Sequence, residues 1–362
     1  MKKVLAAMSG GVDSSVTALL LKNAGFDVIG ATMKLIDSDA VIAGDASIEI
    51  ANVSEKVCCT ADDAFDAKSV CFSLGLPHYV FNFAEDFTSG VIEPFCASYI
   101  RGETPNPCIE CNRKLKFERL LRRAAELDCA KIATGHYARI EEKDGRFLLR
   151  KAVDAKKDQS YVLYTMTQDE LSKTLFPLGG LTKPEVRKLA EENGFVNAAK
   201  HESQDICFVP DGDYAGFIKN YTGKTFPRGK FIDTAGKIIG EHDGIIHYTI
   251  GQRKGLGIAF GVPKYVTAIN AADNTVTLGN IDEIYTNSVT AHKLNIISPE
   301  KINGNLAAKT RYNQAEQPCK VSQTDTDTLK ITFDEPQKAV TPGQSVVLYD
   351  GEYVVGGGII KQ

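Results

Sequence analysis

No apolar run in this sequence is long enough to cross a membrane, and the short run that begins at Val4 ends before it reaches the length of a signal-peptide core. These absences exclude a helical membrane protein and a secreted precursor, so we expect a cytoplasmic protein. An excess of basic residues is also missing, and the net charge of −4 excludes a uniformly basic nucleic-acid-binding surface while leaving local basic patches open. Internal repeats and low-complexity tracts are absent too, which excludes a repeat protein.

The length and the cysteine content set further bounds. A chain of 362 residues is too long for one ordinary hydrophobic core, so we expect two or three domains. Nine cysteines in a reducing compartment do not indicate structural disulfide bonds. Closely spaced cysteines therefore need a chemical explanation first.

Short apolar runs alternate with amphipathic stretches as far as about residue 206, which predicts a doubly wound parallel sheet covered by helices on both faces. We expect strands at residues 4–8, 27–33, 78–83 and 131–134. We expect helices at residues 14–24, 61–74, 87–101, 113–127 and 183–193. Ligands of such a sheet bind beyond the carboxyl ends of its strands.

Beyond residue 207 the helical period gives way to short β-like segments separated by turn signals such as Asp350-Gly351. We expect three domains: an α/β domain at 1–206, a small central module at 207–275 and a C-terminal β-barrel at 276–362. Residues 37–56 form a long, weakly patterned insertion of the kind that serves as a lid or stays disordered.

The first candidate site, between the first expected strand and helix, is the string Ser-Gly-Gly-Val-Asp-Ser-Ser at residues 9–15. Its glycines allow backbone geometry that a Cβ would obstruct, while N–H groups and serine hydroxyls can converge on an anion at the positive end of the helix. We therefore predict a nucleotide phosphate-binding loop. The Gly-Lys-Ser/Thr ending of a Walker A motif is absent, which excludes a P-loop that handles a γ-phosphate.

The second candidate site is the proline-stiffened loop that carries Cys108 and Cys111 directly before a basic helix. A helix N-terminus stabilises thiolate, so one or both thiols should be more nucleophilic than an ordinary cysteine. Three interpretations remain open from the spacing: sulfur-carrying or redox thiols, ligands of a metal or iron-sulfur centre, and buried small residues. Cys207 lies at the end of the α/β half, and its surroundings taken alone predict a cysteine buried in the core.

Basic residues gather on the helix expected at 113–127, and together with Lys156-Lys157 and Arg253-Lys254 they are compatible with an RNA-binding groove. The helix carries Arg113, Lys114, Lys116, Arg119, Arg122 and Arg123.

Six strings follow one another along the chain: SGGVDSS, TPNPCIECN, TGHYA at 134–138, KDQSY at 157–161, ESQDICF at 202–208 and IGQRKGLG at 250–257. The first resembles the signature of the PP-loop ATP pyrophosphatases, whose fold is adenine nucleotide hydrolase-like. The whole series resembles the tRNA-specific 2-thiouridylase family over nearly the whole chain.

This resemblance implies a tRNA-uridine 2-sulfurtransferase that uses ATP to replace the C2 carbonyl oxygen of the wobble uridine, in the anticodon loop of tRNA, with sulfur. A carbonyl oxygen is a poor leaving group, so adenylation from ATP and magnesium would prepare it for displacement. A persulfide on Cys207 would attack the activated carbon, and Cys111 would release the sulfur through a transient Cys111–Cys207 disulfide. The sulfur would come from a donor such as a cysteine desulfurase or a sulfur-relay protein.

The resemblance also implies contacts at individual positions. ATP would bind at Ala7, Met8, Ser9, Gly10, Gly11, Val12, Asp13, Ser14, Met33 and Gly135, with Asp13 as a candidate magnesium contact. The target base would meet Asn106, Pro107 and Cys108, and the rest of the tRNA would meet His136, Lys157, Asp158, Gln159, Arg311, Tyr312 and Gln344. A uridine has to be splayed into a pocket before it can be read along its polar edge, which Asn106 suits chemically.

One position departs from the family pattern, because many members carry an acidic residue where Cys108 stands. The resemblance implies a catalytic role for this position, that of a general acid or base which also contacts the target base. A thiol at Cys108 does not match the acidic residue to which that role is assigned. Cys108, Cys111 and Cys207 instead offer three thiolates, a set able to hold a 4Fe-4S iron-sulfur cluster with one iron open to sulfide. We favour the persulfide route, since the match is closest to enzymes assigned that route, and keep the cluster as its alternative.

Two other functions remain open from the residues alone. An amide-forming PP-loop synthetase would need no reactive cysteine pair, and a non-enzymatic RNA-binding module would bind tRNA without releasing pyrophosphate. Cys58-Cys59 has no histidine or cysteine at a matching zinc spacing, so we assign it no function. We expect the remaining cysteines to be packing residues: Cys71, Cys96, Cys129 and Cys319.

Overall fold

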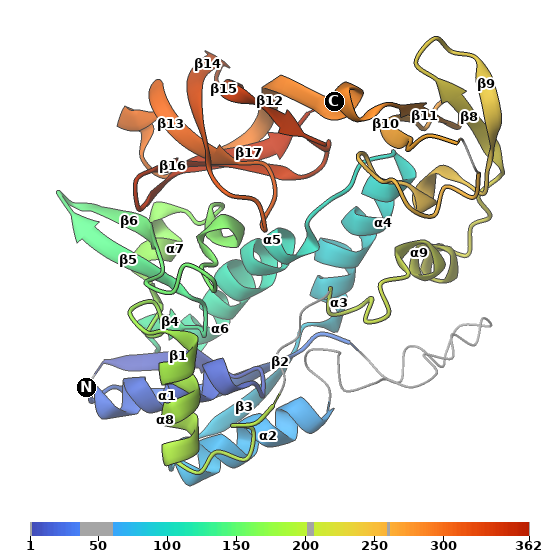
Figure 1. Ribbon diagram of the computed structural model, residues 1–362. Helices are drawn as coiled ribbons and strands as arrows, with labels where there is room; N and C mark the ends of the chain where they lie inside the picture. Colours follow the sequence, from blue (N-terminus) through green and yellow to red (C-terminus); the bar gives the residue numbers. More distant parts are fainter. Residues whose placement is uncertain (1, 37–60, 201–205, 259–260, 362) are drawn as a thin grey trace. The chain divides into compact units, whose positions relative to one another are not determined.

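A computed structural model describes residues 2–36, 61–200, 206–258 and 261–361 (Figure 1). The expected insertion at 37–56 and the pair Cys58-Cys59 lie outside the described residues. The chain forms two compact units. Unit 1 contains Met1–Val91, Cys108–Gly212 and Glu352–Val354, and unit 2 contains Ile92–Pro107, Asp213–Gly351 and Val355–Gln362.

Unit 1 is built on a parallel sheet of five strands in the order β3-β2-β1-β4-β7. The strands are β1 (Lys3–Ala7), β2 (Asp27–Lys34), β3 (His78–Asn82), β4 (Lys131–Ala133) and β7 (Thr174–Leu175). The four expected strands are all present, with ends that differ by a residue or two. Strand β7 was missed, because a strand of two residues is too short to show an apolar pattern.

The centre of this sheet is covered on both faces. Val4, Leu5 and Ala6 of β1 are completely buried. Apolar residues of α1 (Val12–Asn23), α2 (Ala61–Ser73) and α8 (Lys183–Glu192) share one core cluster with residues of β1. This arrangement confirms the expected α/β fold, in which a continuous apolar strand requires helices on both sides.

Two expected helices differ from the structure in a way that moves a candidate site. The helix expected at 87–101 is interrupted by a π-helical turn between α3 (Ala84–Phe87) and α4 (Glu93–Ile100). The helix expected at 113–127 begins earlier, with α5 (Pro107–Cys111), and continues through a π-helical segment into α6 (Leu120–Glu126). Proline suits a first helical turn because it has no N–H to leave unpaired. The cysteine pair therefore lies on the helix, not in the loop before it.

Three further elements of unit 1 follow β4 in the chain. Strands β5 (Ala138–Lys143) and β6 (Arg146–Lys151) form an antiparallel hairpin that follows β4 in the chain. Helix α7 (Gln168–Ser172) begins at a capping box made by Thr167 and Glu170.

The middle part of the chain forms a small mixed sheet in unit 2, with the order β10-β11-β8-β9. Its strands are β8 (Gly229–Asp233), β9 (Ile238–His242), β10 (Tyr265–Asn270) and β11 (Thr275–Gly279). Helix α9 (Tyr214–Thr222) precedes this sheet, and its Tyr214 and Phe217 pack against Phe95 of α4 with ring centroids 6.1 and 6.4 Å away. The helix that opens this part of the chain therefore packs against α4, which belongs to the same unit.

The C-terminal part is an antiparallel barrel, as expected. Its order is β12-β15-β14-β13-β16-β17, and β17 pairs with β12 to close it. The strands are β12 (Tyr285–Ile296), β13 (Gly304–Lys309), β14 (Gln317–Asp325), β15 (Thr328–Lys338), β16 (Ser345–Asp350) and β17 (Tyr353–Ile360). Closure pairs every strand on both sides and so removes the exposed sheet edges. Among the described residues, no helix combines the length and apolar character that a membrane crossing needs. The exact division at 206/207 and 275/276 stays a prediction.

We predict that the barrel depends on the inward-facing side chains of β15. Ile331 is completely buried, whereas the neighbouring Lys330 is exposed because successive side chains point to opposite faces. Ile331→Ala should lower the free energy of unfolding by about 2–5 kcal/mol through lost burial and the cavity left behind. Lys330→Ala, the matched control on the same strand, should change it by less than about 0.5 kcal/mol. Denaturant unfolding measures both, and equal effects would contradict the alternation.

Candidate active site

The loop at residues 8–11 joins the end of β1 to the start of α1, at the carboxyl edge of the parallel sheet (Figure 1). Gly10 has φ +74°, and a Cβ there would lie 2.3 Å from the backbone oxygen of Asp63. Only glycine fits such an approach between two backbone segments. Gly135, at the end of β4, approaches the loop similarly, since its Cβ would lie 3.0 Å from the carbonyl carbon of Asp13.

The serine hydroxyls of the loop bond within it. The Ser14 and Ser15 hydroxyls donate to the carbonyl oxygen of Gly11, at 2.9 and 3.1 Å. The backbone N–H of Ser9 donates to Ser14 Oγ at 3.2 Å. Ser14 and Ser15 are buried, and their hydroxyls hold the shape of this loop.

Asn197 contributes to this loop although sequence reasoning missed it. Its side chain is buried, and Nδ2 donates to the carbonyl oxygen of Gly10 and to Ser15 Oγ, both at 2.9 Å. The residue lies far along the chain after α8, so no local pattern connects it with the loop.

Asp13 receives hydrogen bonds from two further residues that sequence reasoning did not place in the site. Lys183 Nζ lies 2.7 Å from Oδ1 and 2.8 Å from Oδ2 of Asp13. The hydroxyl of Tyr137 donates to Oδ1 at 2.7 Å. Lys183 appeared in the sequence only as part of a helix start. Its side chain is 9% exposed, against 31% for Asp13.

The other expected nucleotide contacts lie on the same edge. Ala7, Met8, Val12 and Met33 are buried. Met33 is the residue before the end of β2, which pairs in parallel with β1. The hydroxyl of Thr32 donates to the carbonyl oxygen of Met8 at 2.8 Å, so the end of β2 is tied to the start of the loop.

The cysteines fall into two groups by exposure. Cys108 is exposed, while Cys111 and Cys207 are half-buried. Four others are buried, and burial raises the pKa to about 11 for Cys71 and Cys96 and to about 12 for Cys319, and also raises that of Cys129. These four stay protonated, as expected of packing residues.

Residues 201–205, which precede Cys207, lie outside the described part of the chain. The ring of Phe208, the next residue, packs edge-on against Phe87 with centroids 5.7 Å apart. In the described residues, no three His, Cys, Asp or Glu side chains are gathered as a metal-binding group. The three thiols named for an iron-sulfur cluster are therefore not assembled as its ligands in this structure.

Three of the expected tRNA contacts in unit 1 have internal partners. His136 is buried between the rings of Phe117 and Phe176, each 5.9 Å away, and its Nδ1 lies 2.7 Å from the Thr134 hydroxyl. Burial, with Lys116 nearby, lowers the pKa of His136 well below its usual value, so the ring is neutral. Asp158 accepts from the backbone N–H of Ala152, and Gln159 from that of Tyr137, both at 2.9 Å. Lys157 is half-buried.

Of the expected contacts in unit 2, Gln344 bonds to the segment that leads to Asn106, and Asn106 is itself half-buried. Arg311 donates to the carbonyl oxygen of Ala339 and to the Thr341 hydroxyl, at 2.9 and 2.6 Å. Gln344 Nε2 donates to the carbonyl oxygen of Thr104 at 2.8 Å. Tyr312 is 37% exposed.

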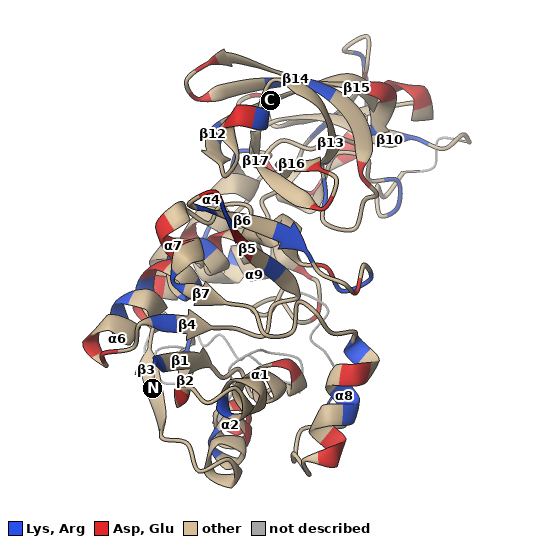
Figure 2. Cartoon of the chain, turned by 90° about the vertical axis from the view of Figure 1, so that its left-hand side faces the viewer, with Lys and Arg blue, Asp and Glu red and all other residues tan. Residues whose placement is uncertain are grey.

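The basic helix carries less unbalanced charge than the sequence indicates, and Figure 2 shows blue and red interspersed on α6. Four of its arginines form ion pairs: Arg113 with Glu110, Arg119 with Asp86, Arg122 with Glu118 and Arg123 with Glu126. This balance weakens the case for an RNA groove on this helix.

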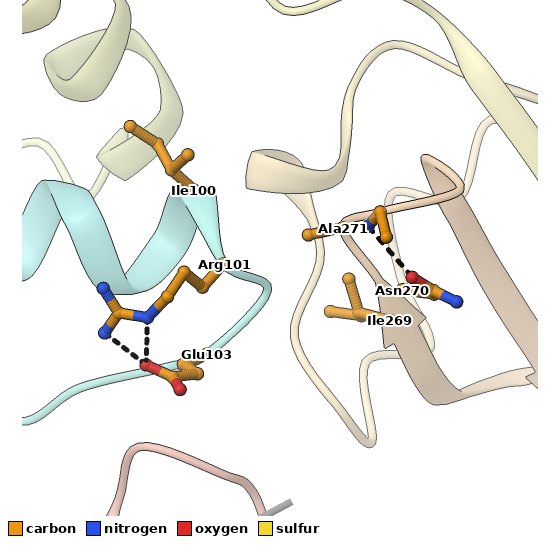
Figure 3. Close-up of a pocket in the computed structure, with 7 residues that line it drawn as sticks. Ile100, Arg101, Glu103, Ile269, Asn270 and Ala271 are labelled. Atoms are coloured by element: carbon orange, nitrogen blue, oxygen red, sulfur yellow. Dashed lines mark hydrogen bonds and ion pairs between the residues drawn. The ribbon is translucent and has the colours of Figure 1, made fainter.

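A cleft of about 530 Å³ lies in unit 2, outside the predicted sites (Figure 3). It is lined by Ile100, Arg101, Glu103, Ile269, Asn270, Ala271 and Ala272. The Arg101 guanidinium pairs with the Glu103 carboxylate at 2.6 Å, so the charges on its wall cancel.

Models of three domain families match the chain in succession. Residues 2–211 match a tRNA methyl transferase HUP domain, residues 215–280 a tRNA methyl transferase PRC-barrel domain, and residues 286–360 an aminomethyltransferase beta-barrel domain. The three segments correspond to the parallel sheet, the small mixed sheet and the barrel.

Full-length relatives give a sharper assignment than these domain descriptions. The tRNA-specific 2-thiouridylase MnmA of Clostridioides difficile (strain 630) is 48% identical over 365 residues, covering 100% of this chain and 98% of that protein. The tRNA-specific 2-thiouridylase MnmA of Lachnoclostridium phytofermentans is 48% identical over 363 residues, covering 99% of each. That of Clostridium acetobutylicum is 47% identical over 362 residues, again covering 99% of each. Similarity of this extent, on a fold with a glycine-dependent loop at the carboxyl edge of a parallel sheet, shows that the chain belongs to the tRNA-specific 2-thiouridylase family.

Proposed function

We propose that this protein is a tRNA 2-thiouridylase that activates O2 of the wobble uridine with ATP and replaces that oxygen with sulfur carried by Cys207. The observation that carries the proposal is the loop at residues 8–11, shaped for phosphate, in a chain that matches 2-thiouridylases over its whole length. The family membership supports the reaction, and the loop supports the use of ATP.

In the first step, the O2 oxygen of the uridine attacks the α-phosphate of ATP and pyrophosphate leaves. The N–H groups at the start of α1 and the positive end of that helix suit the phosphates. Adenylation converts a poor leaving group into AMP. The uridine has to leave its stack to reach the site, since a base inside a stacked loop is not accessible to the α-phosphate.

In the second step, the terminal sulfur of the Cys207 persulfide attacks C2, and AMP leaves. The Cys111 thiolate then attacks the Cys207 sulfur, the S–S bond to the substrate breaks, and the thiocarbonyl remains on the base. A Cys111–Cys207 disulfide forms, which an external thiol reduces. Cys111 and Cys207 are half-buried, unlike the four packing cysteines, which suits thiols that have to meet both a donor and a substrate.

For Cys108 and Asn106 we propose a role in recognising the target base, not in transferring sulfur. Asn106 is half-buried in the segment held by Gln344, and Cys108 is exposed one turn before Cys111. An amide can both donate to and accept from the polar edge of uracil, which a thiol does poorly. We therefore assign base reading to Asn106, with Pro107 fixing its backbone, and a supporting contact to Cys108.

The residues present do not fit an all-protein metal site. Both carboxylate oxygens of Asp13 are bonded to Lys183, and the described side chains contain no group of three metal ligands. Magnesium binds largely through substrate phosphates in many nucleotide sites, so we propose that it enters with ATP. The proposed reaction does not use an iron-sulfur cluster, because the three thiols are not gathered as its ligands.

The tRNA side of the proposal rests on the anticodon loop as the ligand. Tyr312 supplies an exposed ring, and its sequence neighbour Arg311 supplies a positive charge. Lys157 supplies a second positive charge, in the Lys-Asp-Gln string at residues 157–159. Asp158, Gln159 and Gln344 hold the backbone that we propose meets the RNA, and His136 packs between two aromatic rings. The persulfide requires a donor such as a cysteine desulfurase or a sulfur-relay protein. We propose that the reaction takes place in the cytoplasm, where thiols are kept reduced.

We predict that Cys111 and Cys207 are needed for sulfur transfer but not for the release of pyrophosphate from ATP. Cys111→Ala and Cys207→Ala should each abolish 2-thiouridine formation, because the persulfide or its release is lost, while pyrophosphate release from ATP with unmodified tRNA continues. Nucleoside mass analysis and a pyrophosphate assay measure the two reactions. Cys129→Ala, at a buried thiol, is the matched control and should keep both. Full thiolation by Cys111→Ala and Cys207→Ala would contradict the roles proposed for these cysteines. ATP turnover that the two substitutions leave untouched, with no 2-thiouridine formed even by the unmodified protein, would favour an amide-forming synthetase. Binding of tRNA without pyrophosphate release would favour an RNA-binding module.

We predict that the enzyme purified without oxygen is colourless, contains no iron and is fully active with ATP, magnesium, a persulfide donor and tRNA. The physical reason is that its three candidate cluster ligands are not assembled. Iron analysis and a visible absorption spectrum, together with the thiolation assay, provide the measurement. Activity that rises in proportion to bound iron would replace the persulfide route with the cluster route.

A further inference from the structure

We infer that Lys183 is a phosphate-binding residue of the nucleotide site, held beside the loop by Asp13 and directed at the leaving pyrophosphate. This inference rests on the proposed use of ATP. Neither the family resemblance nor any motif of the sequence assigns a role to Lys183.

The position of the ammonium group is the first argument. Lys183 is the first residue of α8, and its Nζ contacts both oxygens of Asp13, the second residue of α1. The cation therefore lies at the first turn of α1, which begins directly after the loop at residues 8–11. Its side chain is only 9% exposed, which is unusual for lysine unless the charge has a dedicated partner.

The second argument is that separate contacts hold both members of the pair. The backbone N–H of Lys183 donates to Asp154 Oδ2 at 3.0 Å. The Thr182 N–H donates to the Glu185 carboxylate at 2.7 Å, which caps the start of α8. On the other side, the Tyr137 hydroxyl donates to Asp13 at 2.7 Å, and Lys183 Nζ lies 5.8 Å from the centroid of the Tyr137 ring. Contacts of the backbone at the start of α8 and of the Asp13 carboxylate thus fix the position of the ammonium group.

The third argument is electrostatic. A carboxylate beside the loop repels a triphosphate, and Lys183 cancels that charge while Tyr137 supplies a second donor to the same carboxylate. An ammonium has three N–H donors in a compact head, so Asp13 and a phosphate oxygen can share it. As the bond to the α-phosphate breaks, negative charge builds on the leaving pyrophosphate, where a fixed cation stabilises the transition state.

If the Lys183–Asp13 pair served only to stabilise the fold, the expected results would differ. Replacing a largely buried ion pair by neutral groups is often neutral or stabilising, so stability by itself does not require Lys183. A structural role would affect all nucleotides alike. A phosphate-binding role would affect ligands that carry the β- and γ-phosphates and spare AMP.

The test compares the affinities of ATP, inorganic pyrophosphate and AMP by isothermal titration, in the presence of magnesium, for the full-length protein and Lys183→Met. We expect ATP and pyrophosphate to bind at least about tenfold more weakly, the loss of one charge-assisted hydrogen bond, with AMP affinity changed by less than about twofold. Turnover of saturating ATP in the pyrophosphate-release assay should fall as well. Lys188→Met, at an exposed lysine of the same helix, is the matched control and should leave all three affinities unchanged.

A second pair of variants covers the case in which Lys183→Met leaves Asp13 uncompensated and the protein unfolds. Asp13→Asn keeps the lysine, and Asp13→Asn combined with Lys183→Met removes both charges. The double variant should bind pyrophosphate at least about tenfold more weakly than Asp13→Asn, with equal affinity for AMP. Equal pyrophosphate affinities, or a uniform loss that includes AMP, would overturn the inference. If the unmodified protein binds neither ATP nor pyrophosphate, the proposed use of ATP fails instead.

Discussion

The nucleotide loop depends on one close backbone contact, that between Gly10 and Asp63. A Cβ at Gly10 would lie 2.3 Å from the Asp63 carbonyl oxygen, so the loop and the start of α2 approach each other only because a side chain is missing. Asn197 holds the other side of the same residue through the Gly10 carbonyl. With Gly135 pressed against Asp13, the loop has three neighbours that leave it one shape. For the phosphate binding that we propose, a loop fixed in this way has little conformational freedom left to lose.

Exposure separates the cysteines that can do chemistry from those that pack. The nucleophile in sulfur transfer is the thiolate, and burial without a partner opposes thiolate formation. Cys71, Cys96 and Cys319, with pKa values raised to about 11 or 12, therefore stay out of exchange reactions. Cys111 and Cys207 are only half-buried, which leaves them more accessible than the packing cysteines to a sulfur donor and a substrate.

Several residues that the family resemblance associates with tRNA also hold the backbone of the site. Gln344 fixes Thr104, two residues before Asn106, and Gln159 fixes the backbone of Tyr137, whose hydroxyl reaches Asp13. Asp158 likewise accepts from Ala152. A side chain of this kind can act on RNA through the segment it positions, without touching a base or a phosphate. His136 differs from these residues, because its buried, neutral ring contacts the Thr134 hydroxyl and the rings of Phe117 and Phe176.

The order of the elements and the location of the nucleotide loop follow from the chain's local patterns. A buried apolar run, two glycines and an amphipathic helix are sufficient to predict β1, the loop and α1, because hydrophobic periodicity and glycine conformation act over neighbouring residues. Local patterns do not reveal the π-helical turns, the two-residue β7 or the start of α5 at Pro107, since packing sets these features. Nor do they reveal Asn197, Tyr137 or Lys183 as neighbours of the loop. Hydrogen bonds and charges join those residues across more than a hundred positions, and only the folding of the sheet and its covering helices brings them within reach of Gly10 and Asp13.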